Sequence, residues 1–114
     1  MKLFHLHLIS DATGETINAV ARACLVQFED MEPVEHTWSM VRSERQLQKV
    51  MDGIAANPGL VLFTLVDDRL RHMLEEKCRS LSVPCISVLD PVLGALGAFL
   101  RTTMRHIPGR QHVL

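Results

Sequence analysis

Two hydrophobic periodicities alternate along the chain. Short apolar runs typical of strands are each followed by a longer segment in which apolar residues recur every three or four positions, as on one face of a helix. Four such strand-then-helix units predict an α/β fold, with an open, mainly parallel four-stranded sheet flanked by helices in a Rossmann-like three-layer arrangement. The order of the strands in the sheet cannot be read from this pattern.

The four predicted strands are short and apolar. Phe4, Leu6 and Leu8 share one face of the first strand. Pro33 precedes the second strand, and we expect it to break the chain there. The third is nearly all apolar, as in a central parallel strand covered on both faces. The strands are expected at residues 3–9, 34–40, 60–66 and 84–89.

Each predicted helix carries one apolar stripe that would face the sheet. The first helix is expected from about Glu15 to Phe28, and Cys24 lies on its stripe. Cys78 lies on the stripe of the third helix, so we expect both thiols to be buried and inert. The expected core positions are Ile17, Val20, Ala21, Cys24 and Phe28; Leu47, Val50, Met51 and Ile54; Leu70, Met73, Leu74, Cys78 and Leu81; and Leu93, Leu96 and Leu100.

Capping residues indicate where three helices begin. Ser43 is expected to cap the second helix, with Gln46 as its capping-box partner. Asp67 or Asp68 is expected to cap the third. Asp90, followed by a proline suited to the first helical position, is expected to cap the fourth.

Composition and charge exclude several classes of function. Twelve Lys and Arg residues against 13 Asp and Glu give a formal net charge of -1, which argues against a nucleic-acid binder. No apolar run has the length of a membrane span, and no secretory signal pattern is present, so we expect a cytoplasmic protein. The three cysteines include no Cys-x-x-Cys pair, so reduced thiols are the simplest interpretation.

Polar residues follow the ends of the predicted strands. In open parallel sheets, ligands bind at the carboxyl ends of the strands, so these residues would form one rim. The rim is acidic and rich in hydroxyls, which suits a cation, a polar small molecule or basic side chains of a partner. Its members are Ser10, Asp11 and Thr13; Ser39; Asp67 and Asp68; and Asp90.

The segment Ser10–Thr16 has two interpretations. In one, Thr13 or Asp11 caps the first helix and the segment is a turn. In the other, Gly14 lets the backbone approach an anion at the helix N-terminus. Asp11 and Glu15 bring negative charge to the same place, which favours the turn, but both interpretations stay open.

Two histidines share a face of the first predicted strand. His5 and His7 stand two residues apart, a spacing that a metal ion could use. No third ligand lies at a suitable spacing, so a packed or hydrogen-bonded pair is the favoured interpretation and no metal site is predicted.

Several of these stretches together resemble one family. Residues 4–16, followed by Ala19–Ala23, resemble the N-terminus of the pyruvate, phosphate dikinase regulatory proteins and the related phosphoenolpyruvate synthetase regulatory proteins. Residues 63–67 and Pro108–His112 also match segments of that family, in the expected order. The similarity covers essentially the whole chain, and its first motif is the most specific.

The resemblance implies a bifunctional serine/threonine phosphotransferase. Proteins of this family transfer a phosphoryl group from ADP to a threonine of the dikinase or the synthetase. They also remove that phosphate with inorganic phosphate, which yields pyrophosphate. The implied partner is therefore pyruvate, phosphate dikinase or phosphoenolpyruvate synthetase, and the implied co-substrates are ADP and inorganic phosphate.

The resemblance also implies that the nucleotide site lies elsewhere. The family carries a P-loop-like segment downstream of Pro-Gly-Arg-Gln-His, and this chain contains no Gly-x-x-x-x-Gly-Lys-Ser/Thr. We therefore expect an N-terminal α/β domain over residues 1–104 and a linker over residues 105–114 toward a missing C-terminal kinase domain. Alone, the chain is expected to be inactive and to bind no cofactor.

Within this domain, phosphoryl transfer would need a carboxylate beside the attacking hydroxyl. Asp11 is the first candidate for that catalytic role and Asp67 the second. The candidate ligands of substrate or phosphate are Ser10, Thr13, Gly14 and Arg110.

Two other functions stay open. The chain could be a non-catalytic module that docks the target, or a Rossmann-like domain that binds a small ligand. A response-regulator receiver would need a lysine at a later strand end, and no lysine follows Lys77. The dikinase and the synthetase are not distinguished as targets, and a homodimer is compatible with the sequence.

Overall fold

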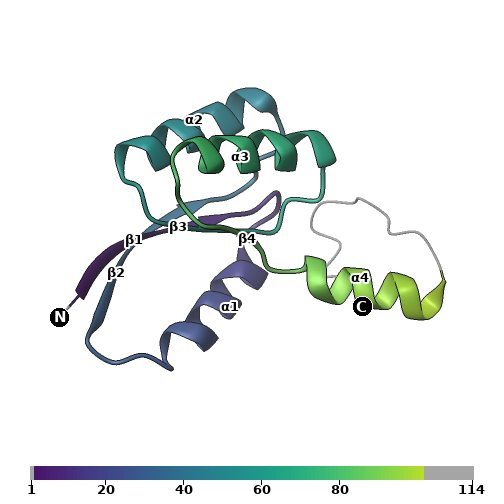
Figure 1. The fold of residues 1–114 in the computed structure, drawn as a ribbon, viewed down its shortest axis with the longest axis horizontal. Coiled ribbons are helices and arrows are strands. Elements are labelled where there is room, and N and C mark those ends of the chain that lie inside the picture. Colours follow the sequence, from purple (N-terminus) through teal and green to yellow (C-terminus); the bar gives the residue numbers. More distant parts are fainter. Residues whose placement is uncertain (1, 102–114) are drawn as a thin grey trace.

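The structure is a computed structural model that describes residues 2–101, and it has the predicted α/β fold (Figure 1). Four parallel strands form one sheet in the order β2-β1-β3-β4. The elements are β1 (Lys2–Ile9), α1 (Glu15–Leu25), β2 (Met31–Trp38), α2 (Glu44–Ala56), β3 (Leu60–Phe63), α3 (Asp68–Ser80), β4 (Cys85–Ser87) and α4 (Asp90–Leu100).

The helices lie on both sides of the sheet. Helices α2 and α3 cover one face and α1 packs on the other (Figure 1). In the sheet, β2 lies on one side of β1, and β3 and then β4 lie on the other side. The topological switch point therefore lies between β1 and β3, where open α/β sheets commonly bind ligands.

Two buried clusters hold these layers together. The larger lies between the sheet and helices α2 and α3, and the smaller lies under α1. The predicted stripes of α2 and α3 are confirmed, as is the shared face of Phe4, Leu6 and Leu8. The larger cluster contains Ile9, Val41, Leu47, Val50, Met51, Ile54, Val61, Phe63, Leu65, Leu70, Leu74 and Cys78.

Two helix caps agree with the sequence and one does not. The Ser43 Oγ accepts the Gln46 N–H at 3.1 Å, and Asp67 caps α3 by accepting the Leu70 N–H at 3.0 Å. The prediction that Asp90 caps α4 is wrong, because Asp90 is the first helical residue and no side chain caps this helix.

Three predictions near α1 and β2 are also wrong. Pro33 lies inside β2 and does not break the chain. An edge strand tolerates proline because only one of its sides needs a hydrogen-bonded neighbour. Helix α1 ends at Leu25, so Phe28 lies beyond the helix and is 63% exposed. Cys24 is exposed and not part of a buried stripe.

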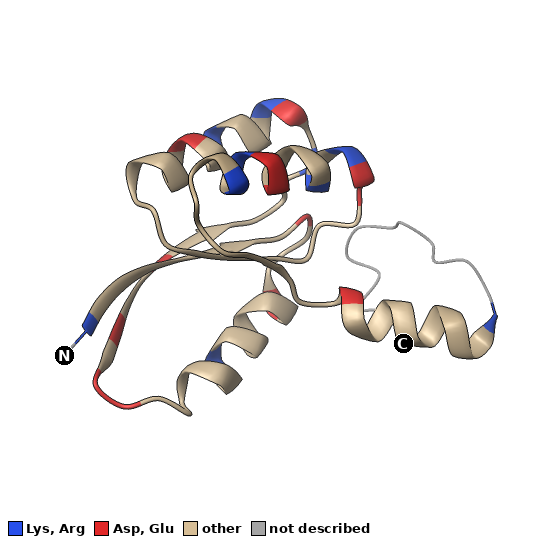
Figure 2. Cartoon of the chain, in the orientation of Figure 1, with Lys and Arg blue, Asp and Glu red and all other residues tan. Residues whose placement is uncertain are grey.

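The predicted core stripe of α4 is wrong as well. Leu96 is 49% exposed and Leu100 is 60% exposed, while Leu93 is half-buried. The helix extends away from the sheet (Figure 1), and Figure 2 shows no charged residue on it between Asp90 and Arg101. An apolar pattern indicates which side chains avoid water, but not whether another layer is present to cover them.

No helix within residues 2–101 combines the length and apolarity needed to cross a bilayer. The predicted linker at residues 105–114 lies outside the described residues, so it stays a prediction.

Candidate functional site

The carboxyl ends of β1 and β3 are joined by a buried aspartate. Asp11, which directly follows the β1 exit loop residue Ser10, is 2% exposed. Its Oδ2 accepts the backbone N–H of Val66 at 3.0 Å, which connects the loops after the two central strands. This contact lies at the switch point, where the fold favours a ligand site.

The Ser10–Gly14 loop folds back on itself. The Ser10 Oγ accepts the Ala12 N–H at 3.0 Å, and Ser10 is buried. Gly14 is the N-cap of α1 and has a φ of 91°, a left-handed conformation that favours glycine. The N-cap position of α1 is therefore held by Gly14, and not by Thr13 or Asp11 as predicted. Thr13 is exposed on this loop.

A cation that the sequence analysis missed also reaches the loop. The Arg42 Nε donates to the backbone carbonyl oxygen of Asp11 at 2.6 Å, and the Arg42 backbone N–H donates to the Gln46 Oε1 at 2.7 Å. Arg42 is exposed, so its guanidinium reaches the surface at the loop that contains Asp11. Arg42 could have been predicted from its position shortly after β2, because ligand sites lie at the carboxyl ends of parallel strands. The other rim residues were found in the same way.

Several carboxylates of the predicted acidic rim bind other groups of the chain. One oxygen of Asp67 caps α3, and Asp90 forms an ion pair with Arg71. The Arg71 guanidinium also lies over the ring of Phe63, 5.6 Å from its centroid. Asp67 is exposed, which makes it more accessible than Asp11.

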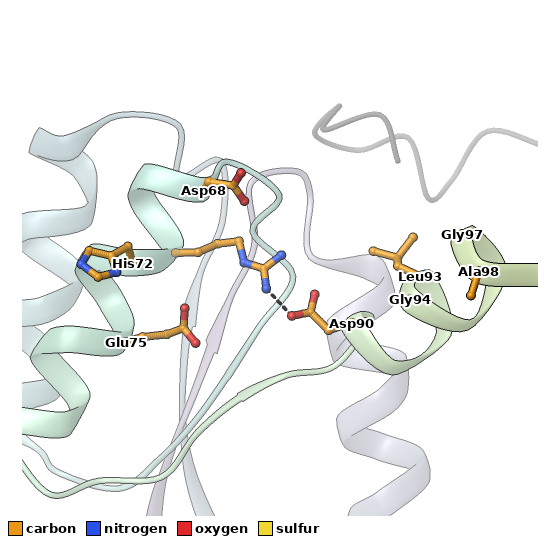
Figure 3. A pocket seen from close by; sticks show the side chains of 9 residues that line it. Asp68, His72, Glu75, Asp90, Leu93, Gly94, Gly97 and Ala98 are labelled. Atoms are coloured by element: carbon orange, nitrogen blue, oxygen red, sulfur yellow. Dashed lines mark hydrogen bonds and ion pairs between the residues drawn. The ribbon is translucent and has the colours of Figure 1, made fainter. Parts of the chain in front are cut away.

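A cleft of about 660 Å³ opens between α3 and α4 (Figure 3). Asp68, His72 and Glu75 line it on α3, and the Arg71–Asp90 ion pair bridges its two walls (Figure 3). The α4 wall is formed by small and apolar side chains (Figure 3).

The two strand histidines, predicted to be a packed or hydrogen-bonded pair, instead form hydrogen bonds with different partners. The Trp38 Nε1–H donates to the His7 Nδ1 at 3.2 Å, and the His7 Nε2 lies 2.8 Å from the Asn57 carbonyl oxygen. Because tryptophan only donates and a carbonyl only accepts, His7 is held as the neutral Nε2–H tautomer. Burial lowers the pKa of His7, and His36 and His5 lower it further. His5 instead contacts His36, with 2.9 Å between ring nitrogens.

Within residues 2–101, no three His, Cys, Asp or Glu side chains are grouped so that they could hold a metal ion. Arg110, a predicted phosphate ligand, lies outside the described residues.

Comparisons with known proteins converge on one group. A family model described as Kinase/pyrophosphorylase matches residues 6–114. A protein of Paramagnetospirillum magneticum is 58% identical over the whole chain, which covers 37% of that protein. A relative from Rhodospirillum rubrum is 50% identical over the whole chain, which covers 42% of that protein. A relative from Caulobacter vibrioides is 50% identical over 97% of the chain, and the match covers 35% of that protein.

The names of these three relatives describe them as pyruvate, phosphate dikinase regulatory proteins. The chain spans about two fifths of the length of the curated relatives that it matches.

Proposed function

The chain belongs to the kinase/pyrophosphorylase family, and on this premise we propose that it is the target-facing part of a regulatory phosphotransferase. In the forward reaction, the β-phosphoryl group of ADP passes to a threonine hydroxyl of the target, which leaves AMP and a phosphothreonine. In the reverse regulation, inorganic phosphate takes that phosphoryl group, which yields pyrophosphate and restores the threonine.

Pyruvate, phosphate dikinase is the proposed target. The relatives from three organisms carry names that describe them as regulators of this enzyme, and their identity to the chain is 50–58%. Phosphoenolpyruvate synthetase, the other target implied by the sequence resemblance, is the alternative.

The switch-point rim would receive the phosphorylated or phosphorylatable threonine. Phosphoryl transfer depends on positioning and on groups that neutralise developing charge. Thr13, Gly14 and Arg42 offer a hydroxyl, one backbone N–H group at the N-cap of α1 and a guanidinium at one edge of the sheet. Together these groups suit the oxygens of a phosphoryl group.

The two predicted carboxylates would then have different roles. Asp67 is exposed and follows Val66 directly, so its carboxylate would approach the attacking hydroxyl as a general base. Asp11 is buried and binds Val66, so it would act as a positioning residue that holds the β3–α3 loop in place. Ser10 would support the loop between β1 and α1 through its hydrogen bond with Ala12.

The observation that carries this proposal is the family match over residues 6–114. It is tested with a chimera in which this chain replaces the matching 37% of the Paramagnetospirillum magneticum relative. The chimera and the parent relative are each incubated with the dikinase and ADP labelled in its β-phosphate. Label on a dikinase threonine with both proteins supports the proposal. Label with the parent alone, from a folded chimera, contradicts it.

A further inference from the structure

Two cysteines that the sequence places seven positions apart meet between α3 and β4. Cys78 lies near the end of α3 and is 1% exposed, and Cys85 is the first residue of β4 and is half-buried. Cys85 packs against the core cluster that contains Cys78, and both cysteines line one small cleft. The Val83 N–H donates to the Cys78 carbonyl oxygen at 3.0 Å, which turns the chain back between them.

A small cleft borders this pair. It has a volume of about 180 Å³ and is lined by Glu75, Cys78, Arg79, Val83 and Cys85. A water molecule takes up about 30 Å³ in the liquid, so a molecule the size of hydrogen peroxide fits in this cleft. Arg79 and Glu75 bring opposite charges to the cleft wall.

The two thiols are chemically unequal. Interaction with the Cys85 side chain lowers the pKa of Cys78, and the same interaction raises the pKa of Cys85. Cys78 is therefore the better nucleophile of the two, and Cys85 is placed to react with whatever forms on it.

We propose that Cys78 and Cys85 are a redox-sensitive dithiol that hydrogen peroxide converts into an intramolecular disulfide. The Cys78 thiolate attacks peroxide, becomes a sulfenic acid and releases hydroxide. The Cys85 sulfur then attacks the Cys78 sulfur, the S–S bond forms, and the sulfenic oxygen leaves as water. In total, two thiols and one hydrogen peroxide give one disulfide and two waters.

The disulfide would tie the end of α3 to an edge strand of only three residues. Helix α3 also provides Arg71, whose ion pair with Asp90 bridges the larger cleft. Oxidation should therefore make this side of the sheet more resistant to unfolding, because a cross-link lowers the entropy of the unfolded chain.

The test uses a Cys24→Ser variant, because Cys24 is exposed and would otherwise react. The folded variant is treated with equimolar peroxide and then digested with trypsin, which cleaves after Arg79 between the two cysteines. We expect both free thiols to disappear, a mass loss of about 2 Da for the two hydrogens removed, and a linked pair of peptides that dithiothreitol separates. The thermal midpoint should rise by roughly 5 °C or more.

A second variant tests the order of the steps. In Cys24→Ser/Cys85→Ser, peroxide should leave a sulfenic acid on Cys78 that a dimedone-type reagent captures, with no rise in thermal midpoint. The proposal is overturned if the Cys24→Ser variant keeps two free thiols after peroxide treatment, or if its disulfides link only separate molecules. The main measurement does not depend on the folding of the second variant.

Discussion

The buried Asp11 Oδ2 accepts a hydrogen bond from the Val66 N–H at 3.0 Å and so connects the ends of the two central strands. The contact spans 55 positions of sequence and lies at the topological switch point of the sheet. It places exposed Asp67, the next residue after Val66, beside the Ser10–Gly14 loop. The account of the site depends on this contact.

Replacing Asp11 should separate a structural effect from a catalytic one. Asp11→Ala leaves the buried Val66 N–H without its present acceptor, so the free energy of unfolding should fall by about 1–3 kcal/mol. Asp11→Asn retains an acceptor oxygen and should keep most of the stability. Urea denaturation of both variants is the measurement, and equal stability of Asp11→Ala and the unsubstituted chain would contradict the role given to this bond.

Two glycine substitutions should have opposite outcomes. A Cβ at Gly59 would overlap the backbone carbonyl oxygen of His5, which is fixed in β1, so Gly59→Ala should cost at least about 2 kcal/mol. Gly94→Ala is the matched control, because within residues 2–101 the added Cβ meets no atom within 4 Å apart from its chain neighbours and its own helix backbone, and alanine favours the helix interior by about 1 kcal/mol. Thermal denaturation of both variants checks the sign of each effect.

Stability should fall as the solution becomes acidic. Burial lowers the pKa of His7 below its ordinary value of 6.5, so the unfolded chain binds a proton that the folded chain does not. This contribution is fully present above pH 6.5 and is lost as the pH falls toward the folded-state pKa, by at most about 1.4 kcal/mol per pH unit. Protonation of the His7 Nδ1 would also remove the acceptor of the hydrogen bond from the Trp38 Nε1–H.

Urea denaturation at pH 7.5, 6.5 and 5.5 measures this dependence. The His7→Gln variant lacks the titrating group, so its free energy of unfolding should vary less over the same range. An identical decline in His7→Gln and the unsubstituted chain would assign the pH dependence to other groups.

The rim arginine should affect catalysis more than stability. In the chimera, Arg42→Ala should lower kcat for phosphoryl transfer by about 100-fold or more, the scale for removing one group that stabilises the transition state. Arg45→Ala is the control, because Arg45 is an exposed arginine on α2 outside the rim. Asp67→Asn should lower kcat similarly if Asp67 is the general base. Changes confined to KM in both variants would favour a docking module instead.

Local features were predictable because local residues determine them. Ser43 and Asp67 cap helices through backbone groups three residues away, and the apolar stripes of α2 and α3 follow one period. Likewise, the expectation that Asp11 and Asp67 follow the ends of strands is confirmed, because they lie after β1 and β3. These inferences needed no knowledge of which strands are neighbours.

Contacts between distant segments were not predictable in this way. The Asp11–Val66 and Arg42–Asp11 bonds depend on the strand order, which no local pattern specifies. The same is true of the Trp38–His7 bond and the meeting of Cys78 with Cys85. The exposure of Leu96 and Leu100 on α4 was missed because periodicity does not report whether a covering layer exists.

The central claim is that this chain supplies the side of the site that receives the target, while ADP binds in another part of the longer protein. Calorimetric titration of ADP into the 114-residue chain and into the chimera tests it most directly. We predict measurable heat of binding with the chimera and none with the chain alone. Binding of ADP to the chain alone would contradict the claim and would make the Ser10–Thr16 segment the leading nucleotide-phosphate site.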